Sequence, residues 1–573
     1  MNRGLLLGTV IAFGFFVVLA RLAGLMLMDH ASLSAMASNQ YLSESSIQVK
    51  RGQILDRQGR VLAVSIGAKS LYCYRGEVPH PRTVALEVSE ATGLRYAGLL
   101  REMAGQGGKK RHFVWLKRKL TQGEAEKLGG LKTGDGLGFV RETRRYYPSG
   151  TLASQVLGYV NIDNKAMSGV EREYNSTLTD KGGQVVVERD ATGRVLSEGL
   201  HMESSGDNIV LTIDEGLQYM AESALDAAME KWKARSASLI MMDPYTGAIL
   251  AMANRPTFNP NDPGAYGARA LKDRAMMDLY EPGSVFKIVM GTAALESGVV
   301  TPDSTFNCYG GVFTVGGRTF HDVERNGVLT FRQIIEKSSN VGSIQVALKL
   351  GPDKFYHNAR LLGFGARTGI DLPWESAGRI VYPHTDVSLA SNAIGYGVAV
   401  TPLQVLRAYS AIANGGYLVT PHVVSMITGP GGQVISRFHD RAKRVIAPEA
   451  VALFKSILSG VTQKGGTAPL AAVAGNEVSG KTGTSRLFDP RTGRYSDRYS
   501  ATFVGFVPAD NPKIAMIVVF KAPKGAIYGG TVAGPVFSQV ATEALAYLHV
   551  PFDQPATDEI DFKGGRHAVV YAP

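Results

Sequence analysis

The sequence predicts an α+β protein with a single N-terminal transmembrane helix, an elongated strand-rich module and a larger domain whose helices cover an antiparallel sheet. Three observations lead there: an apolar run opens the chain, short alternating segments follow, and both strand and helix periodicities fill the remainder. At 573 residues the chain is long enough for two or more domains. The expected parts are a cytoplasmic tip and anchor at 1–30, the strand-rich module at 31–205, the large domain at 206–548 and a tail at 549–573.

The composition indicates folded protein and excludes several classes of site. Hydrophobic residues make up 45% and charged residues 19% of the chain. The formal net charge of +11 comes from Lys and Arg spread along the sequence, so an anionic membrane or cell-wall surface fits it as well as nucleic acid does. Cys73 and Cys308 lie far apart and outside any C-x-x-C or His cluster. We therefore expect no disulfide framework, no metal site and no cofactor.

The N-terminus predicts a membrane anchor. Residues 4–20 are uncharged and apolar, and the apolar run resumes after Arg21 as residues 22–28, near the length that spans a bilayer. Arg3 is expected on the cytoplasmic side and Arg21 near the outer interface, where its side chain can snorkel. A cleaved signal peptide is the alternative, but the A-x-A-like site at 35–37 lies too far beyond the apolar core. Nearly everything after residue 30 is thus expected outside the cytoplasm.

The module at 31–205 reads as a series of short elements. We expect strands at 46–55 and 60–65 around a turn at 56–59, a helix at 124–128, an extended segment at 138–146, a helix at 151–159, and a hairpin of 183–189 and 194–197 around residues 190–193. No apolar segment is long enough for the core of a large enzyme domain. We interpret the module as non-catalytic, because the Glu-centred motifs of a glycan-polymerising domain are not evident.

We expect the large domain to contain a strand, then helices, then further strands and a final helix. The expected elements are a strand at 208–213, a helix from 214 to about 235 capped by Asp214, a hairpin of 239–243 and 248–253, mostly helices from 284 to about 409, strands at 501–507 and 513–521, and a closing helix at 535–548. This order predicts one sheet covered by helices.

Ser284-Val285-Phe286-Lys287 is the first of three motifs that carry chemistry. Pro282 and Gly283 interrupt what precedes, so Ser284 is expected at a helix N-terminus, where its own N–H can donate to an oxyanion. Spacing of three places Lys287 one turn on, within reach of the Ser284 hydroxyl. Lys287 can act as the base only if its pKa falls toward neutrality, by burial or near another cation, for which Lys481 is the candidate.

The second and third motifs add the other parts of an acyl-transfer site. Ser338-Ser339-Asn340 offers a hydroxyl in Ser338 that can pass a proton and an amide in Asn340 that can hold Lys287 and a substrate; a helix-capping Ser-Asn pair is the structural alternative. Lys481-Thr482-Gly483-Thr484 has strand periodicity, with Thr482 and Thr484 hydroxyls placed to bind a terminal carboxylate beside the Lys481 charge. Gly483 is expected to let a substrate backbone lie close, and the Thr484 N–H to be a second oxyanion donor.

A P-loop match overlaps the third motif. Residues 475–482 satisfy G-x-x-x-x-G-K-[ST]. A P-loop must lead straight into a helix, whereas Gly483, Pro490 and Gly493 follow here without apolar periodicity. We therefore reject a nucleotide site.

The three motifs together resemble the S-x-x-K, S-x-N and K-T-G signature of penicillin-binding proteins and serine β-lactamases. A β-lactamase with a dedicated deacylating Glu would carry E-x-x-L-N between the second and third motifs, and none of Glu375, Glu449 and Glu477 starts one. Further segments resemble motifs of class B penicillin-binding proteins: 51–59, 145–148, 158–160, 169–171, 243–247, 254–256, 281–284, 393–397 and 401–404. Two of them, 281–284 and 393–397, resemble the cell-division type within that class. The second motif departs from the common Ser-Asp-Asn.

The resemblance implies a penicillin-binding transpeptidase domain and a peptidoglycan D,D-transpeptidase at the division septum. It implies a single-pass inner-membrane protein with an extracytoplasmic catalytic domain, acylated by β-lactams at Ser284. Stem peptides, the membrane, a SEDS-family glycan polymerase and other divisome proteins are the implied partners, and no nucleic acid is expected. The alternatives are a D,D-carboxypeptidase or slow β-lactamase, an elongation-specific transpeptidase, a β-lactam sensor and a catalytically silent division scaffold.

Overall fold

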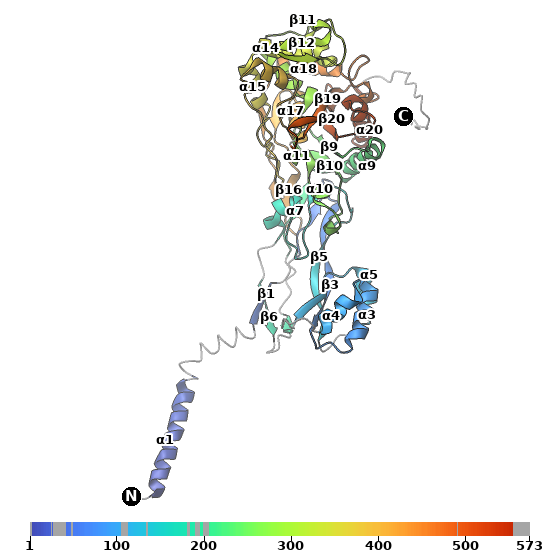
Figure 1. Cartoon of the computed structure of the whole chain (residues 1–573). Helices are drawn as coiled ribbons and strands as arrows, with labels where there is room; N and C mark the ends of the chain where they lie inside the picture. The colour runs from blue at the N-terminus through green and yellow to red at the C-terminus, as the bar shows by residue number, and fades with distance from the viewer. Residues whose placement is uncertain are drawn as a thin grey trace. The chain divides into compact units, whose positions relative to one another are not determined.

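The computed structural model of the chain describes residues 3–24, 26, 42–46, 50–104, 113–132, 136–179, 184–189, 195–198, 205–489 and 491–553. The chain forms two compact units (Figure 1). Unit 1 comprises Met1–Arg51, Gly67–Thr143 and Thr179–Gly206, and unit 2 comprises Gly52–Ile66, Arg144–Leu178 and Asp207–Pro573. The last segment of unit 1 ends at Gly206. Two segments of the expected module, however, fold with unit 2.

Unit 1 has a small core between a strand pair and short helices. The second half of β3 (Val61–Tyr74) pairs with β4 (Phe113–Lys117), and their inward side chains pack on α3 (Pro81–Thr92) and α4 (Tyr96–Ala104). Pro81 starts α3 and Gly93, at φ +69°, ends it, as helix capping predicts. Its other elements are β1 (Leu42–Ser46), α5 (Gln122–Lys127), β6 (Gln184–Arg189), β7 (Val195–Glu198) and most of β5 (Leu137–Tyr146).

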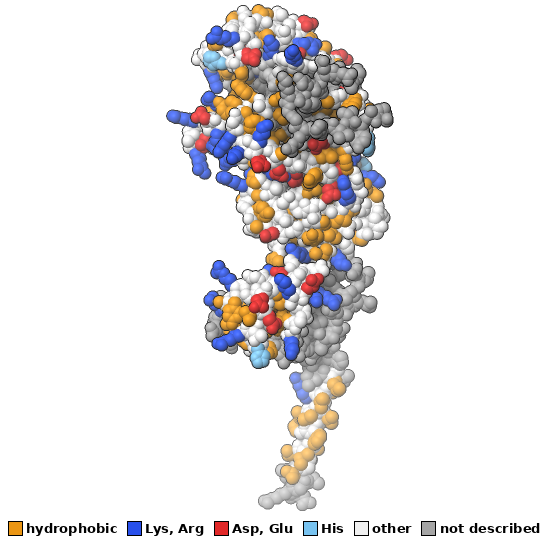
Figure 2. All heavy atoms as spheres, turned by 90° about the vertical axis from the view of Figure 1, so that its right-hand side faces the viewer, with side chains coloured by type: hydrophobic (Ala, Val, Ile, Leu, Met, Phe, Trp, Pro, Cys, Tyr) orange, Lys and Arg blue, Asp and Glu red, His pale blue; other side chains and the backbone are white. Residues whose placement is uncertain are grey.

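The hairpin expected near 190 is confirmed as the antiparallel pair β6–β7, and its turn residues lie outside the described residues. Helix α1 (Arg3–Ala23) occupies most of the expected anchor. Its side chains from residue 7 on are largely apolar and exposed, and Figure 2 shows hydrophobic side chains along its visible face. Within the described residues, no helix meets the length and apolarity required to cross a membrane.

Unit 2 is built on a five-stranded antiparallel sheet in the order β10–β9–β21–β20–β19. Successive residues of β9 point to opposite faces, so Leu239 and Met241 join one hydrophobic cluster while Ile240 and Met242 join another. The first cluster lies under α9 and α20, and the second under α12 and α17. The prediction of an antiparallel sheet covered by helices is confirmed. The sheet strands are β9 (Ser236–Met242), β10 (Ile249–Arg255), β19 (Ser479–Asp489), β20 (Arg494–Val507) and β21 (Ile514–Lys521).

The helices of unit 2 follow the sequence expectation at both ends of the domain. Asp214 caps α9 by accepting from the N–H groups of Gly216 and Leu217. The helices are α6 (Ser154–Leu157), α7 (Gly169–Glu173), α8 (Asn175–Leu178), α9 (Glu215–Trp232), α10 (Ala268–Leu271), α11 (Arg274–Met277), α12 (Lys287–Glu296), α13 (Phe331–Glu336), α14 (Asn340–Leu350), α15 (Pro352–Leu361), α16 (Asp386–Ala393), α17 (Pro402–Ala413), α18 (Pro448–Ser459), α19 (Gly529–Val532) and α20 (Gly534–Tyr547), with 3-10 turns η2 (Pro263–Ala265), η3 (Gly283–Phe286), η4 (Tyr309–Gly311) and η5 (Pro469–Ala471).

Short strands interrupt the region expected to be mostly helical. They are β11 (Thr305–Asn307), β12 (Val312–Val315), β13 (Arg318–His321) and β14 (Val328–Thr330), and further strands of unit 2 are β2 (Ile54–Leu55), β8 (Asn208–Leu211), β15 (Tyr417–Val419), β16 (Val424–Thr428), β17 (Val434–Arg437) and β18 (Ala442–Arg444). The expectation was wrong for 305–330, because three- and four-residue strands are too short to show a period in the sequence.

The turn at 56–59 shows why an N-terminal motif folds with unit 2. Asp56 is fully buried and accepts hydrogen bonds from the N–H groups of Gln58 and Arg60, both at 2.8 Å. The Arg60 guanidinium lies 3.1 Å from Asp214, the N-cap of α9. The turn is therefore held against the start of the large domain's first helix.

Candidate active site

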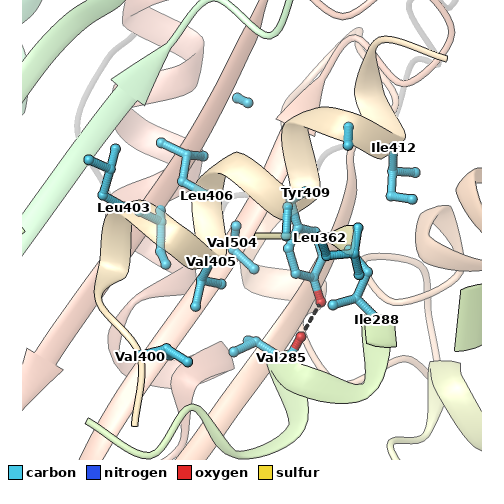
Figure 3. Close-up of a cluster of buried hydrophobic side chains, with 14 of the residues drawn as sticks. Val285, Ile288, Leu362, Val400, Leu403, Val405, Leu406, Tyr409, Ile412 and Val504 are labelled. Atoms are coloured by element: carbon cyan, nitrogen blue, oxygen red, sulfur yellow. Dashed lines mark hydrogen bonds between the residues drawn. The ribbon is translucent and has the colours of Figure 1, made fainter. Parts of the chain in front are cut away.

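The first motif lies in a 3-10 turn that leads into a helix. Ser284 sits in η3, after Gly283 at φ +59°, and Lys287 begins α12. A Cβ at Gly395 would lie 2.1 Å from the Gly283 carbonyl oxygen, so the close contact between these two backbone segments requires glycine at position 395. Helix α17 supports the same turn, because the Tyr409 hydroxyl donates to the Val285 carbonyl at 2.9 Å (Figure 3). The predicted position of Ser284 at a helix N-terminus is confirmed.

Lys287 is buried and held by the second motif. Its Nζ donates to the carbonyl oxygens of Ser338 (2.7 Å) and Ser339 (3.1 Å), to the Ser338 hydroxyl (3.2 Å) and to Asn340 Oδ1 (3.1 Å). Burial lowers the pKa of Lys287 to about 7, although the Asp322 charge acts in the opposite direction. No hydrogen bond joins Lys287 Nζ to Ser284 Oγ in the described chain. The ammonium is instead directed to the Ser338–Asn340 turn.

The second motif caps a helix, as the structural alternative expected, and Asn340 also holds Lys287, whereas the proton-passing role of Ser338 stays a prediction. Ser339 is the N-cap of α14 and accepts from the Gly342 N–H at 3.0 Å. Ser338 has φ +59°, and this left-handed conformation directs both its carbonyl and its hydroxyl to Lys287. The motif thus presents four oxygens to one ammonium while starting a helix.

Asp322 organises the second motif and has no local signal in the sequence. Its carboxylate accepts from the Ser339 hydroxyl (2.7 Å) and from the backbone N–H groups of Asn340 and Val341. The neighbouring His321 carbonyl accepts from Asn340 Nδ2 at 2.9 Å. Asp322 follows β13, one of the short strands that the sequence did not reveal, and therefore it could not be assigned in advance.

The third motif lies on β19, the edge strand of the sheet, as its periodicity predicted. Lys481 is buried, and its Nζ lies 3.4 Å from the Thr482 hydroxyl. Burial, and then the positive charge of Lys287, hold the pKa of Lys481 well below its ordinary value. The sequence left burial and a nearby cation open as causes of a lowered Lys287 pKa, and burial is the dominant cause for both lysines.

Gly483 is needed for contact within the protein. A Cβ at this position would lie 2.7 Å from the Pro282 carbonyl oxygen and 3.0 Å from the Val285 side chain. The segment that carries Ser284 is thus one close neighbour that requires glycine here, and the expectation that Gly483 also lets a substrate backbone lie close stays a prediction. The Thr482 hydroxyl pairs with that of Thr467 at 2.8 Å, and the Thr484 hydroxyl accepts from the Gly529 N–H at 3.2 Å.

Glu281 joins three segments around the serine. Its Oε1 accepts from the Gly397 N–H (2.8 Å) and from the Tyr495 hydroxyl (3.0 Å), and its carbonyl accepts from the Ser485 hydroxyl (2.5 Å). The Tyr495 ring packs edge-on against Tyr396 at 5.7 Å between centroids. Glu281 is thus a site residue to which sequence reasoning gave no role.

The P-loop match has no structural counterpart. Residues 475–482 lead into β19, with no helix following Thr482. The three motifs are therefore the only sequence-predicted site that the described chain assembles.

Comparisons with known proteins identify the class and the family. An antiparallel sheet with a serine at a helix start, a buried lysine and a lysine-bearing edge strand is the arrangement of a serine acyltransferase. Residues 237–542 match the family described as "Penicillin binding protein transpeptidase domain" and residues 46–211 match "Penicillin-binding Protein dimerisation domain". The chain belongs to the class B penicillin-binding proteins of the FtsI type.

Relatives are similar over nearly the full length. The chain is 32% identical over 563 residues to a probable peptidoglycan D,D-transpeptidase PbpC of Pseudomonas aeruginosa, covering 96% of each. It is 30% identical over 561 residues to peptidoglycan D,D-transpeptidase FtsI of Escherichia coli, covering 95% of this chain and 91% of that protein. Penicillin-binding protein 3 of Mycobacterium tuberculosis in complex with aztreonam has a TM-score of 0.68 and 28% identity, covering 89% and 98%.

Proposed function

We propose that this protein is a peptidoglycan D,D-transpeptidase that cross-links stem peptides at the division septum. One observation carries the proposal: Lys287 is buried on the second motif with a pKa of about 7, one turn after Ser284 and beside Lys481. A lysine in this state is partly neutral at neutral pH and can accept a proton from a serine. The names of the relatives and the β-lactam complexes of the structural neighbours agree with this chemistry.

The residues take the following roles in the proposed reaction. Ser284 Oγ attacks the carbonyl of the penultimate D-Ala, and its proton passes to Lys287. The amide bond breaks as Lys287, through the Ser338 hydroxyl, returns a proton to the leaving D-Ala amine. A stem-peptide amine then attacks the acyl-enzyme ester, which forms the cross-link and restores the Ser284 hydroxyl.

The remaining site residues bind the substrate, stabilise the oxyanion or position Lys287. The backbone N–H groups of Ser284 and Thr484 are assigned to the oxyanion. Lys481, Thr482 and Thr484 are assigned to the terminal carboxylate, and Gly483 keeps their strand against the serine turn. Asn340 holds Lys287 through its Oδ1.

Covalent labelling of the full-length protein with a fluorescent penicillin tests the site. Ser284→Ala is expected to abolish labelling, and Lys287→Ala to slow it by a factor of about 10³ or more, because the base is removed. Ser149→Ala is the matched control, since Ser149 bonds Glu215 outside the site. Labelling that survives Ser284→Ala would contradict the assignment. Product analysis with a stem-peptide donor and an amine acceptor separates cross-linking from hydrolysis by a carboxypeptidase or slow β-lactamase.

The division role, the partners and the anchor belong to the same proposal. We assign α1 as a single-pass anchor that places the catalytic domain outside the cytoplasm, supported by its exposed apolar side chains (Figure 2). The family resemblance supports a SEDS-type glycan polymerase as partner. Deleting residues 1–30 should release the protein from membranes washed with carbonate.

A depletion strain tests the division role. Wild type should restore septation, and Ser284→Ala should not. Restored septation by Ser284→Ala would support a silent scaffold, and restored rod elongation without septation would support the elongation role.

A further inference from the structure

A cavity of about 280 Å³ lies between α15, α17, β15 and β18, and four cationic residues line it together with apolar ones. The four cations are Arg360, Arg407, Arg441 and Lys443, and none of the residues that line the cavity is acidic. Leu418 and Val445 provide a buried apolar part of the wall. None of the residues that bond to Lys287 or Lys481 lines this cavity.

Arg407 is the innermost of these cations. Its Nε donates to the Val419 carbonyl at 2.6 Å, which fixes the guanidinium at the side of α17. Burial lowers the pKa of Arg407 to about 10, with only the Glu375 charge acting against it. The Glu375 carboxylate is already bonded to the N–H groups of Thr368 (2.6 Å) and Gly369 (3.1 Å). Arg407 is therefore a cation at neutral pH, and no carboxylate of the described residues is in contact with it.

The other three cations are exposed and also lack carboxylate partners. No ion pair joins Arg360, Arg441 or Lys443 to an acidic side chain within the described ranges, and one nitrogen of Arg360 bonds the carbonyls of Phe364 and Gly365. Cations that line one concave surface repel each other and create a positive potential there. A bound anion would relieve this repulsion and supply the missing countercharge.

We propose that this cavity binds a phosphoryl or diphosphoryl group. Its volume is near the lower end of ligand sites, which span about 300–1,000 Å³, so a small group is favoured over a whole peptide. Three of the four cations are arginines, whose planar forks bind phosphate oxygens in pairs. Four positive charges match a group with two or more negative charges better than one carboxylate. The proposal concerns a site beyond the proposed reaction and does not depend on it.

Calorimetric titration of the full-length protein with inorganic pyrophosphate at fixed ionic strength tests the site. Saturable one-to-one binding is expected, and Arg441→Gln/Lys443→Gln should weaken it by about tenfold or more. Both positions are exposed, so the double variant is expected to fold. Lys464→Gln/Lys513→Gln is the matched control, because it removes the same two charges at exposed positions elsewhere.

The outcomes decide the proposal and the source of the group. Equal weakening of pyrophosphate binding in both double variants would overturn the proposal, because it would show only general charge attraction. Absence of saturable binding by wild type would overturn it as well. Citrate that competes as well as pyrophosphate would overturn the phosphoryl assignment. Displacement of pyrophosphate by soluble short-chain phosphatidylglycerol would point to a lipid headgroup, and displacement by inorganic phosphate alone to a free phosphate. Labelling by fluorescent penicillin should stay unchanged in Arg441→Gln/Lys443→Gln, which separates this test from that of Ser284.

Discussion

At the scale of single residues, the two active-site lysines differ in their contacts and in what lowers their pKa values. Lys287 makes four hydrogen bonds to the second motif, and burial sets its pKa near 7. Lys481 has only weak contacts with Thr482 and is affected by the charge of Lys287. The pKa of Lys287, the proposed base, therefore depends mainly on burial, and Lys481 remains available for its proposed role of binding an anionic substrate group.

The pH dependence of acylation should report the Lys287 pKa. Because the neutral amine is the base, the rate should rise as pH increases through about 7, whereas an ordinary lysine would require a pH near 10. Asp322→Asn removes the charge that raises this pKa, so its midpoint should move to lower pH. Lys481→Ala should leave the midpoint nearly unchanged. An alkaline shift in Lys481→Ala, measured with a fluorescent penicillin, would contradict control by burial.

Glu281 should position the serine turn rather than react. Glu281→Ala loses both Oε1 hydrogen bonds and is expected to slow acylation by about tenfold, while Glu281→Gln, which keeps an acceptor, should stay within about threefold. Tyr495→Phe should slow it less, because the Gly397 contact remains. Tyr499→Phe is the control, since that hydroxyl accepts from Arg486. If the effects of Glu281→Ala and Tyr495→Phe on the acylation rate are additive in the double variant, the two residues do not act through their shared hydrogen bond.

At the scale of elements, the contact between edge strand β19 and turn η3 defines the site. Gly483 lets the strand approach the Pro282 carbonyl, and the Ser485 hydroxyl bonds the Glu281 carbonyl at the next position on the same face. The strand periodicity was visible in the sequence. The partner of Gly483 was not, because it lies about 200 residues earlier in the chain.

A methyl group at Gly483 should separate these two elements. Gly483→Ala is expected to destabilise the protein by about 1–3 kcal/mol through overpacking and to slow acylation, because β19 moves away from Ser284. Thermal unfolding and penicillin labelling measure the two effects. Gly67→Ala is the control, since its Cβ would meet nothing within 4 Å in β3. Normal acylation by Gly483→Ala would show that the strand adapts.

At the scale of the whole molecule, two N-terminal segments complete the core of unit 2. The hydrophobic cluster that contains Val285 and Ile288 also includes buried residues of these two segments: Ile54, Leu62, Tyr147, Val156, Val170 and Leu178. Arg145 and Glu171 form a fully buried ion pair at 2.6 Å, and Arg145 also donates to the Gly52 carbonyl at 2.7 Å. The motifs at 51–59, 145–148 and 169–171 therefore have a structural role in the catalytic unit.

A fragment of residues 206–573 should fail to fold like the full chain. It would expose apolar surface that the two missing segments cover. We expect little penicillin labelling and a lower unfolding temperature than for residues 31–573. A stable fragment that labels at the wild-type rate would contradict this account. In the longer chain, Glu171→Ala should cost about 3–5 kcal/mol, because it removes the carboxylate that pairs with the buried Arg145 guanidinium.

The sequence by itself determined the first and last helices of the large domain, most strands of its sheet, the order of the three motifs and the placement of Ser284 at a helix start. These features depend on local periodicity, capping residues and short spacing, all of which are readable along the chain. Only the tertiary structure decided that Lys287 is tuned by burial, that Gly483 faces Pro282, that Asp322 and Glu281 organise the motifs, and that residues 52–66 and 144–178 fold with the catalytic unit. Each of these depends on contacts between segments distant in sequence, and local periodicity and spacing do not show which segments meet.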